Sequence, residues 1–150
     1  MVDACLYFSR ADGATDPIAV RERLAGIAAQ SRPNNTADEI TGVLAGSRDA
    51  YLQLVEGPRG ALSRLLERIY RDERHDGVVL ARYWTPGERL FANWAMTPIQ
   101  PEKRADLVFD YAALRAMDAD ALMKRLIELA ALSGASDPAP IDIDEDVVRL

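Results

Sequence analysis

Along the first hundred residues, short apolar runs alternate with stretches in which apolar residues recur at helical spacing. Residues 2 to 9 are apolar and free of glycine and proline, which is typical of a buried strand. Asp16 and Pro17 predict a helix start, because aspartate favours the N-cap and proline the first helical position. The apolar residues that follow at helical spacing are Val20, Leu24, Ile27 and Ala28. Pro33 predicts the end of this helix, since proline disfavours helical geometry in the residue before it.

The middle of the chain continues the same alternation. The predicted elements are strands at 39 to 47 and 50 to 56, a helix at 59 to 71, and strands at 77 to 84 and 90 to 97. The helix is predicted from four apolar residues at helical spacing, which are Leu62, Leu65, Leu66 and Ile69. Gly57-Pro58 separates it from the strand before it.

This order, β-α-β-β-α-β-β, predicts a mixed α/β (α+β) fold. A four-stranded sheet with two helices on one face is the ferredoxin-like arrangement, here with one strand added. Such a sheet leaves its second face bare, and that face must be covered. We expect C-terminal helices to cover it. Leu107, Val108 and Leu114 predict a short one, and Asp118 caps another whose apolar face holds Leu122, Met123, Leu126, Ile127, Leu129 and Ala130.

Composition places the chain among globular proteins of one domain. It has 150 residues, of which 49% are hydrophobic, and a formal net charge of −6. We divide it into a core at 1 to 100, capping helices at 101 to 134, and an acidic tail at 135 to 150 with the composition of a disordered segment. The acidic balance disfavours nucleic-acid binding. With a single cysteine, Cys5, and neither a signal peptide nor an apolar run of membrane length, we expect a cytoplasmic protein without a membrane partner.

The common catalytic patterns are absent from the sequence. His75 is the only histidine, so one chain cannot form a histidine metal cluster. The sequence contains neither a glycine-rich phosphate loop nor a nucleophile elbow. The acidic run at 142 to 146 lacks the glycine of a calcium loop and reads as a solvated tail. We therefore expect neither a metal site nor an enzyme.

Two polar side chains interrupt otherwise apolar strands. Gln53 lies in the middle of Tyr51-Leu52-Gln53-Leu54-Val55, and Tyr7 lies in the first strand. A buried glutamine needs hydrogen-bond partners, and a phenol can be one because it both donates and accepts. The alternative is that Gln53 faces solvent on an ordinary alternating strand, and position alone favours this alternative.

Four segments together resemble the BLUF family, the sensors of blue light using FAD. They are LYFS at 6–9, NNTADEITG at 34–42, LQLVEGP at 52–58, and RDERH at 71–75 followed by FANWAM at 91–96. Each segment alone is a weak signal. Together they cover about residues 2 to 100 in the order and spacing of the family.

The resemblance implies non-covalently bound FAD, with its isoalloxazine ring between the two helices. Tyr7 and Gln53 would be the photoactive pair, with Gln53 between the phenol and flavin N5 and O4. The implied cofactor-binding residues are Ile27, Ser31, Asn34, Asn35, Gln53, Arg68, Ile69, Asp72, Arg74 and His75. Trp94 and Met96 would transmit the signal. For Asp72, Arg74 and His75 a solvated helix end is the alternative, and for Trp94 and Met96 it is core filling.

The resemblance also implies how the protein acts. It resembles a short, single-domain BLUF photoreceptor that is not an enzyme, that signals to a separate downstream protein, and that forms a homo-oligomer. Two rival functions remain open at this stage. One is a small ferredoxin-like hydrolase acting on acyl phosphates, with Asn35 and Arg68 as anion binders. The other is a regulatory module that has lost its flavin.

Overall fold

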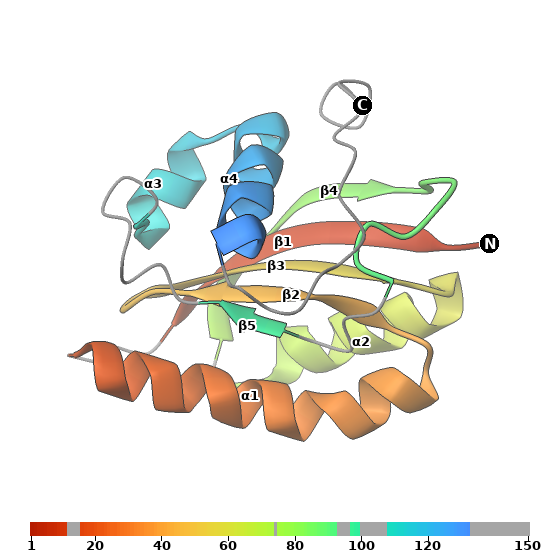
Figure 1. Cartoon of the computed structure of the whole chain (residues 1–150), viewed down its shortest axis with the longest axis horizontal. Coiled ribbons are helices and arrows are strands. Elements are labelled where there is room, and N and C mark those ends of the chain that lie inside the picture. The colour runs from red at the N-terminus through yellow and green to blue at the C-terminus, as the bar shows by residue number, and fades with distance from the viewer. Residues whose placement is uncertain (12–15, 74, 93–96, 100–107, 133–150) are drawn as a thin grey trace.

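The protein folds into three layers, with helices on both sides of a twisted sheet (Figure 1). The computed structural model describes residues 1–11, 16–73, 75–92, 97–99 and 108–132. The elements are β1 (Asp3–Ala11), α1 (Pro17–Ala37), β2 (Thr41–Gly46), β3 (Ala50–Gly57), α2 (Arg59–Arg71), β4 (His75–Trp84), β5 (Thr97–Ile99), α3 (Tyr111–Ala116) and α4 (Ala119–Leu132). None of the helices in these ranges is both long enough and apolar enough to cross a membrane.

Within the described residues the sheet has the strand order β4-β1-β3-β2-β5. The first four strands pair antiparallel, and β5 pairs parallel with β2. This is the predicted ferredoxin-like sheet with one strand added at its edge. β1 and β3, like β2, therefore have a neighbouring strand on each side. We call β1 and β3, which pair with each other, the central strands.

Side chains of β1 alternate between the two faces of the sheet, as a strand period of two requires. Cys5 and Tyr7 pack in the apolar cluster against α1 and α2, whereas Leu6 and Phe8 pack in the cluster against α3 and α4. Figure 1 shows the two helix pairs on opposite sides of the sheet. We call these sides the α1/α2 face and the α3/α4 face.

The C-terminal helices cover the second face, as predicted. Asp118 caps α4, since its Oδ1 accepts a hydrogen bond of 2.8 Å from the Ala121 N–H. The predicted apolar positions of α4 are all buried: Leu122, Met123, Leu126, Ile127, Leu129 and Ala130. In the shorter helix, Leu114 is buried, but Val108 precedes the helix and is exposed. Leu107 and residues 133 to 150, which include the predicted tail at 135 to 150, lie outside the described residues.

The start of α1 agrees with the prediction, and its end does not. Asp16 Oδ1 accepts a hydrogen bond of 2.8 Å from the Ala19 N–H, and Pro17 is the first helical residue. The helix then runs through Pro33 to Ala37. Pro33 leaves the carbonyl of Ala29 without its helical donor. Both residues are exposed, so water can reach that carbonyl, and the helix tolerates the proline.

The actual end of α1 is set by backbone bonds one turn later. The Asp38 N–H donates to the Asn34 carbonyl at 2.9 Å, and the Ile40 N–H donates to the Asn35 carbonyl at 2.7 Å. Glu39 has a φ of 57°, in the left-handed region that ends helices. Glu39 therefore belongs to this turn and not to the predicted strand, which begins at Thr41.

The last two strands also differ from the prediction. β4 begins at His75, two residues before the predicted start at Gly77. Leu90 and Phe91 lie in the connection after β4, not in a strand, and β5 comprises Thr97–Ile99. The physical reason is that the N–H groups of Leu90 and Phe91 are bound by a side chain. They donate to the carboxylate of Glu56 at 2.7 and 3.0 Å, so they do not join a strand ladder.

Candidate functional site

A cavity of about 220 Å³ lies between the α1/α2 face of the sheet and the two helices. The sheet supplies its floor through Tyr7 and Gln53, and the helices supply its walls. Its lining residues are Tyr7, Ile27, Gln30, Ser31, Asn34, Asn35, Gln53, Leu65, Arg68, Ile69 and Asp72. Most of the predicted site residues, which come from four different elements, therefore line one cavity.

Tyr7 and Gln53 lie directly opposite each other on the paired strands β1 and β3. The Tyr7 phenol donates a hydrogen bond to Gln53 Oε1. Both residues are buried, so Gln53 does not face solvent, contrary to the alternative that position alone favoured. Burial is the main cause that raises the pKa of the Tyr7 phenol well above its ordinary value. The phenol is therefore a neutral hydrogen-bond donor at any physiological pH.

Ile27 and Ile69 form two apolar walls of the cavity, one from each helix. Their exposed fractions are 7% and 8%, so their side chains are held by the surrounding core. Leu65, one turn before Ile69 on α2, and Gln30, one turn after Ile27 on α1, also line the cavity. We had not predicted these two as site residues. The i, i+3 and i, i+4 spacing from the predicted isoleucines is the signal that would have found them.

The C-terminal end of α1 supplies the polar wall. Asn35 is buried with 1% of its surface exposed, whereas Asn34 is exposed at the rim. Ser31 donates a hydrogen bond of 2.7 Å from Oγ to the Ile27 carbonyl, so its hydroxyl follows the helix backbone. Ser31 precedes Pro33, and the continuation of α1 past Pro33 puts Asn34 and Asn35 on helical positions beside the same cavity.

The C-terminal end of α2 contributes Arg68 and Asp72. Arg68 Nη2 lies 3.7 Å from Oδ2 of Asp38, and Arg64 Nη2 lies 3.4 Å from the other oxygen of that carboxylate. These pairs are partly exposed, so each contributes little to stability. Arg68 thus lies beside the Asp38 carboxylate and also lines the cavity. Asp38 lies within the NNTADEITG segment, but we had assigned it no role.

For four of the predicted site residues, the structure describes either nothing or the backbone alone. Arg74, Trp94 and Met96 lie outside the described residues. His75 is described only as the first residue of β4, where its Cα is paired with that of Ala11. Their predicted roles stay predictions.

The donors and walls of this cavity suit a flavin ring. Two isoleucines on facing helices suit the two sides of a flat aromatic system. The edge of the ring carries carbonyls and an N–H group, and the amides of Asn34, Asn35 and Gln53 both donate and accept. A bare anion would find fewer partners, because Arg68, the one guanidinium among the described lining residues, lies beside the carboxylate of Asp38.

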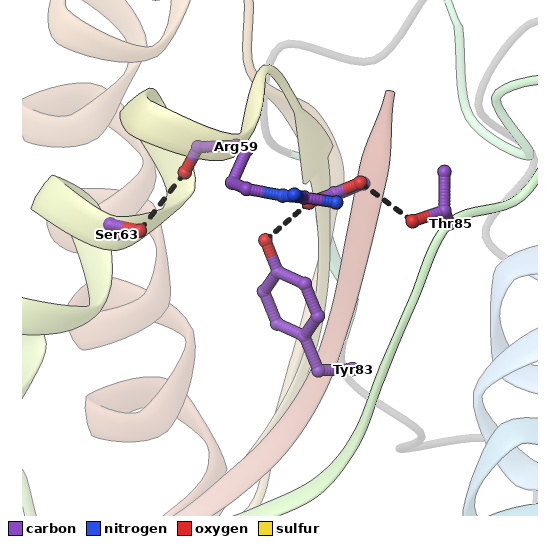
Figure 2. A network of polar contacts seen from close by, with 5 residues as sticks. Arg59, Ser63, Tyr83 and Thr85 are labelled. Atoms are coloured by element: carbon purple, nitrogen blue, oxygen red, sulfur yellow. Dashed lines mark hydrogen bonds and ion pairs between the residues drawn. The ribbon is translucent and has the colours of Figure 1, made fainter. Parts of the chain in front are cut away.

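A second polar network, which the sequence did not reveal, ties β1 to α2 and β4. Asp3 is fully buried on β1 and accepts hydrogen bonds from Arg59 Nε at 2.7 Å, Tyr83 Oη at 2.6 Å and Thr85 Oγ1 at 2.8 Å. Figure 2 shows the side chains of Arg59, Tyr83 and Thr85 gathered around this carboxylate. The bond from Arg59 is the main cause that holds the pKa of Asp3 well below its usual range, followed by the bond from Tyr83.

Comparisons with known proteins agree with the geometry. The family described as sensors of blue-light using FAD (BLUF) matches residues 2–97. The BLUF protein BlrB in its dark state is 26% identical, with a TM-score of 0.70, over 88% of this chain and 96% of BlrB. BlsA in its ground state is 22% identical, with a TM-score of 0.73, over 95% of this chain and 93% of BlsA.

Some structures that resemble this chain are much longer. A bacterial light-regulated adenylyl cyclase is 23% identical with a TM-score of 0.63, and the match covers all of this chain but 39% of the cyclase. No curated protein matches the chain by sequence. The family match spans well over half of the chain and includes every described residue that lines the cavity. The chain therefore belongs to the BLUF family, the sensors of blue light using FAD.

Proposed function

We propose that this protein senses blue light through a hydrogen-bond switch formed by Tyr7 and Gln53. The observation that carries the proposal is their buried hydrogen bond on the floor of a cavity with apolar walls. A glutamine buried on a central strand is costly unless its amide is bonded. A switch function would explain why glutamine occupies this position, because its amide can adopt two hydrogen-bond arrangements.

The cofactor-binding residues in this proposal are residues that line the cavity. Ile27 and Ile69 would hold the two sides of the ring, and Asn34, Asn35 and Arg68 its polar edge, with no covalent bond to the protein. Ser31 and Asp72 line the same cavity and complete its rim. Arg74 and His75 remain candidates from the family motif alone. The bound flavin supplies the absorption of blue light and, once excited, an acceptor for one electron.

Tyr7 is the electron and proton donor in this proposal. Because its pKa is raised by burial, the phenol carries its proton in the dark and can release it together with an electron. Gln53 lies next along the hydrogen bond and passes the proton on. Return of electron and proton to Tyr7 leaves Gln53 with its amide reversed or tautomerised, which changes whether it donates or accepts at the flavin O4 position.

Cys5 does not provide an alternative photochemistry. It lies on the same face of β1 as Tyr7, but it is fully buried and is absent from the residues that line the cavity. Burial raises the pKa of its thiol to about 12, so the thiol stays protonated and is a poor nucleophile. We therefore propose hydrogen-bond rearrangement rather than a flavin–thiol bond.

We further propose that this protein is a sensor rather than an enzyme, and that its output passes through β5 and the C-terminal helices to a separate protein. Support comes from the register of the sheet. Gln53 is opposite Leu44 of β2, and Leu44 is opposite Pro98 of β5. Only β2 lies between the strand that carries Gln53 and the edge strand β5. In the sequence, β5 directly follows Trp94 and Met96, the two positions that the family resemblance assigns to signal transmission.

The test is the absorption of purified protein in the dark and under blue light. We expect yellow protein that releases FAD on denaturation, and a reversible shift of the flavin band to longer wavelength. Gln53→Leu fills much of the same space but removes the amide, so it should bind FAD and lose the shift. A Gln53→Leu protein with the wild-type shift would exclude Gln53 as the switch. A colourless wild-type protein that takes up no FAD would exclude the sensor function.

A further inference from the structure

The connection from β4 to β5 has to cross the whole sheet, because these strands lie at opposite edges. Its described part, residues 85–92, is held at two points by buried carboxylates of the central strands. Near its start, Thr85 Oγ1 donates to Asp3 of β1 at 2.8 Å. Farther along, the Leu90 and Phe91 N–H groups donate to Glu56 of β3. In Figure 1 this connection passes the end of the sheet where the N-terminus lies.

Glu56 is a strong attachment point. It is fully buried, and its two oxygens accept two consecutive backbone N–H groups at 2.7 and 3.0 Å. Burial raises the pKa of the Glu56 carboxyl, and the two N–H bonds and the charge of Arg89 act against that rise. Because both oxygens accept from N–H groups, the geometry suits the ionised carboxylate, whose hydrogen bonds are roughly twice as strong as neutral ones. Arg89 reinforces the contact through Nη1, which donates to the Glu56 carbonyl at 3.2 Å, and Nη2, which donates to the Glu39 carbonyl at 2.6 Å. Phe91 is fully buried in the core of the α3/α4 face.

Glu56 and Gln53 lie on the same strand, but their side chains point to opposite faces of the sheet. Gln53 lines the cavity on the α1/α2 face. Leu54 packs in the core of the α3/α4 face, so Glu56, two residues later, points to that side as well. β3 therefore carries the photoactive glutamine on one face and the attachment of the β4–β5 connection on the other, three residues apart.

From this arrangement we propose that Glu56 is a positioning residue that couples Gln53 to the β4–β5 connection. The proposal rests on the proposed light-driven rearrangement of Gln53. A small twist or shift of β3 at Gln53 moves the Glu56 carboxylate, and the carboxylate moves Leu90 and Phe91 with it. The signal thereby reaches the segment that enters β5 by a route that does not depend on contacts across β2.

The matched variants are Glu56→Gln and Asp3→Asn. Glu56→Gln keeps the size of the side chain but replaces one acceptor oxygen by an N–H₂ group, which faces a backbone donor. Asp3→Asn makes the same change in the other buried carboxylate that holds this connection, on the neighbouring strand. Both proteins are studied loaded with FAD, by hydrogen exchange of peptides that cover residues 86 to 99 and by absorption spectra, in the dark and under blue light.

We expect wild-type protein to show a light-dependent change of exchange in this segment. Glu56→Gln should keep the flavin shift, exchange the Leu90 and Phe91 amides roughly ten- to a hundredfold faster in the dark, and lose the light-dependent change. Asp3→Asn should keep that change. If Glu56→Gln does not fold, Glu56→Asp, which keeps the charge but is one methylene shorter, should weaken both effects.

Several results would overturn the proposal. They are a light-dependent change that survives in Glu56→Gln or is undiminished in Glu56→Asp, an equal loss in Asp3→Asn, and a wild-type protein whose flavin shift is accompanied by no change in this segment. In each of these the wild-type flavin shift remains, so the proposed function stands. A wild-type protein without the shift would instead remove the proposed function and this coupling together.

Discussion

Arg59, the first residue of α2, donates a hydrogen bond of 2.7 Å from Nε to the buried Oδ2 of Asp3 on β1. Because Tyr83 and Thr85 bind the same carboxylate, one acidic group joins the start of β1, the start of α2 and the end of β4. The ionised carboxylate is favoured in the folded protein, and this preference links folding to pH.

The first prediction is the direction in which the stability of the protein changes with pH. The pKa of Asp3 is lower in the folded protein than its ordinary value of 3.8, so its contribution to stability is present above about pH 4 and is lost as the pH falls toward the folded pKa. Asp3→Asn should therefore unfold more easily than wild type at pH 7, and the difference should shrink below pH 4. Urea unfolding between pH 7 and pH 2 measures it.

The control for Asp3 is Asp76→Asn. Asp76 forms an exposed pair with Arg10, with 3.9 Å between Nη1 and Oδ1, and such pairs contribute little. This variant should unfold close to wild type at every pH. A destabilisation of Asp3→Asn that is the same at pH 7 and pH 2.5 would show that Asp3 acts through packing and not through its charge.

The second prediction separates Tyr7, the proposed photoactive tyrosine, from a neighbour of the same type. Tyr7→Phe removes the hydroxyl that bonds Gln53, at a cost in unfolding free energy of about 1 kcal/mol, and should abolish the flavin red shift while FAD stays bound. Tyr51 is equally buried on the same face but is not among the residues that line the cavity. Tyr51→Phe should keep the shift. Loss of the shift in both variants would mean that the face as a whole, and not the Tyr7 bond, carries the response.

The elements that the sequence predicted well are those fixed by local patterns. The α2 bounds of 59 to 71 follow from four apolar residues at helical spacing between Pro58 and the polar segment at 72. The start of α1 follows from Asp16 and Pro17 alone. The opposition of Tyr7 and Gln53 was suggested by two polar residues in apolar strands, although position alone had favoured the other interpretation of Gln53.

The misplaced elements depend on contacts that are distant in sequence. Leu90 and Phe91 have the apolar character of a strand, but Glu56, 34 residues earlier, accepts their N–H groups. Nothing near position 90 indicates this. Likewise Asp3 and Glu56, acids near strand ends, look like solvent-facing residues until their donors from β4 and the connection are known. Pro33 was misread because local propensity cannot tell whether the carbonyl that it frees will be reached by water.

The third prediction concerns the walls of the cavity. Ile69→Ala removes the apolar side chain that we propose contacts one side of the flavin ring, which should cost about 1–2 kcal/mol and weaken FAD binding by roughly 5- to 30-fold. Ile18, on the same helix as the other wall residue Ile27, is 65% exposed and does not line the cavity. Ile18→Ala is therefore the control and should bind FAD like wild type. The measurement is titration of the flavin-free protein with FAD. Equal affinity in all three proteins would exclude Ile69 as a wall of the flavin site.

The fourth prediction concerns the helices that cover the α3/α4 face. Leu122, Leu126 and Leu129 of α4 are each 1% exposed or less, and they pack in one cluster with residues of the sheet such as Leu6 and Leu52. Deleting residues 118 to 150 leaves these sheet residues uncovered, and exposed apolar surface of this kind promotes association. We expect the truncated protein to aggregate or to change its oligomeric state while it still binds FAD. The cavity is formed on the other face, and none of its described lining residues belongs to α3 or α4.

A deletion of residues 133 to 150 is the matched control, because it removes the acidic tail and leaves α4 in place. This protein should keep the assembly state and the flavin shift of wild type. Light scattering and gel filtration report the assembly state, and the light-minus-dark spectrum reports the flavin site. If the longer deletion left a protein with the wild-type assembly state, the cover of the α3/α4 face would not be needed to keep the sheet in solution. If it abolished FAD binding, the flavin site would depend on α4, although none of the described lining residues of the cavity belongs to that helix. The two faces of the sheet have separate apolar clusters. We therefore expect the longer deletion to change the assembly state and to leave FAD bound.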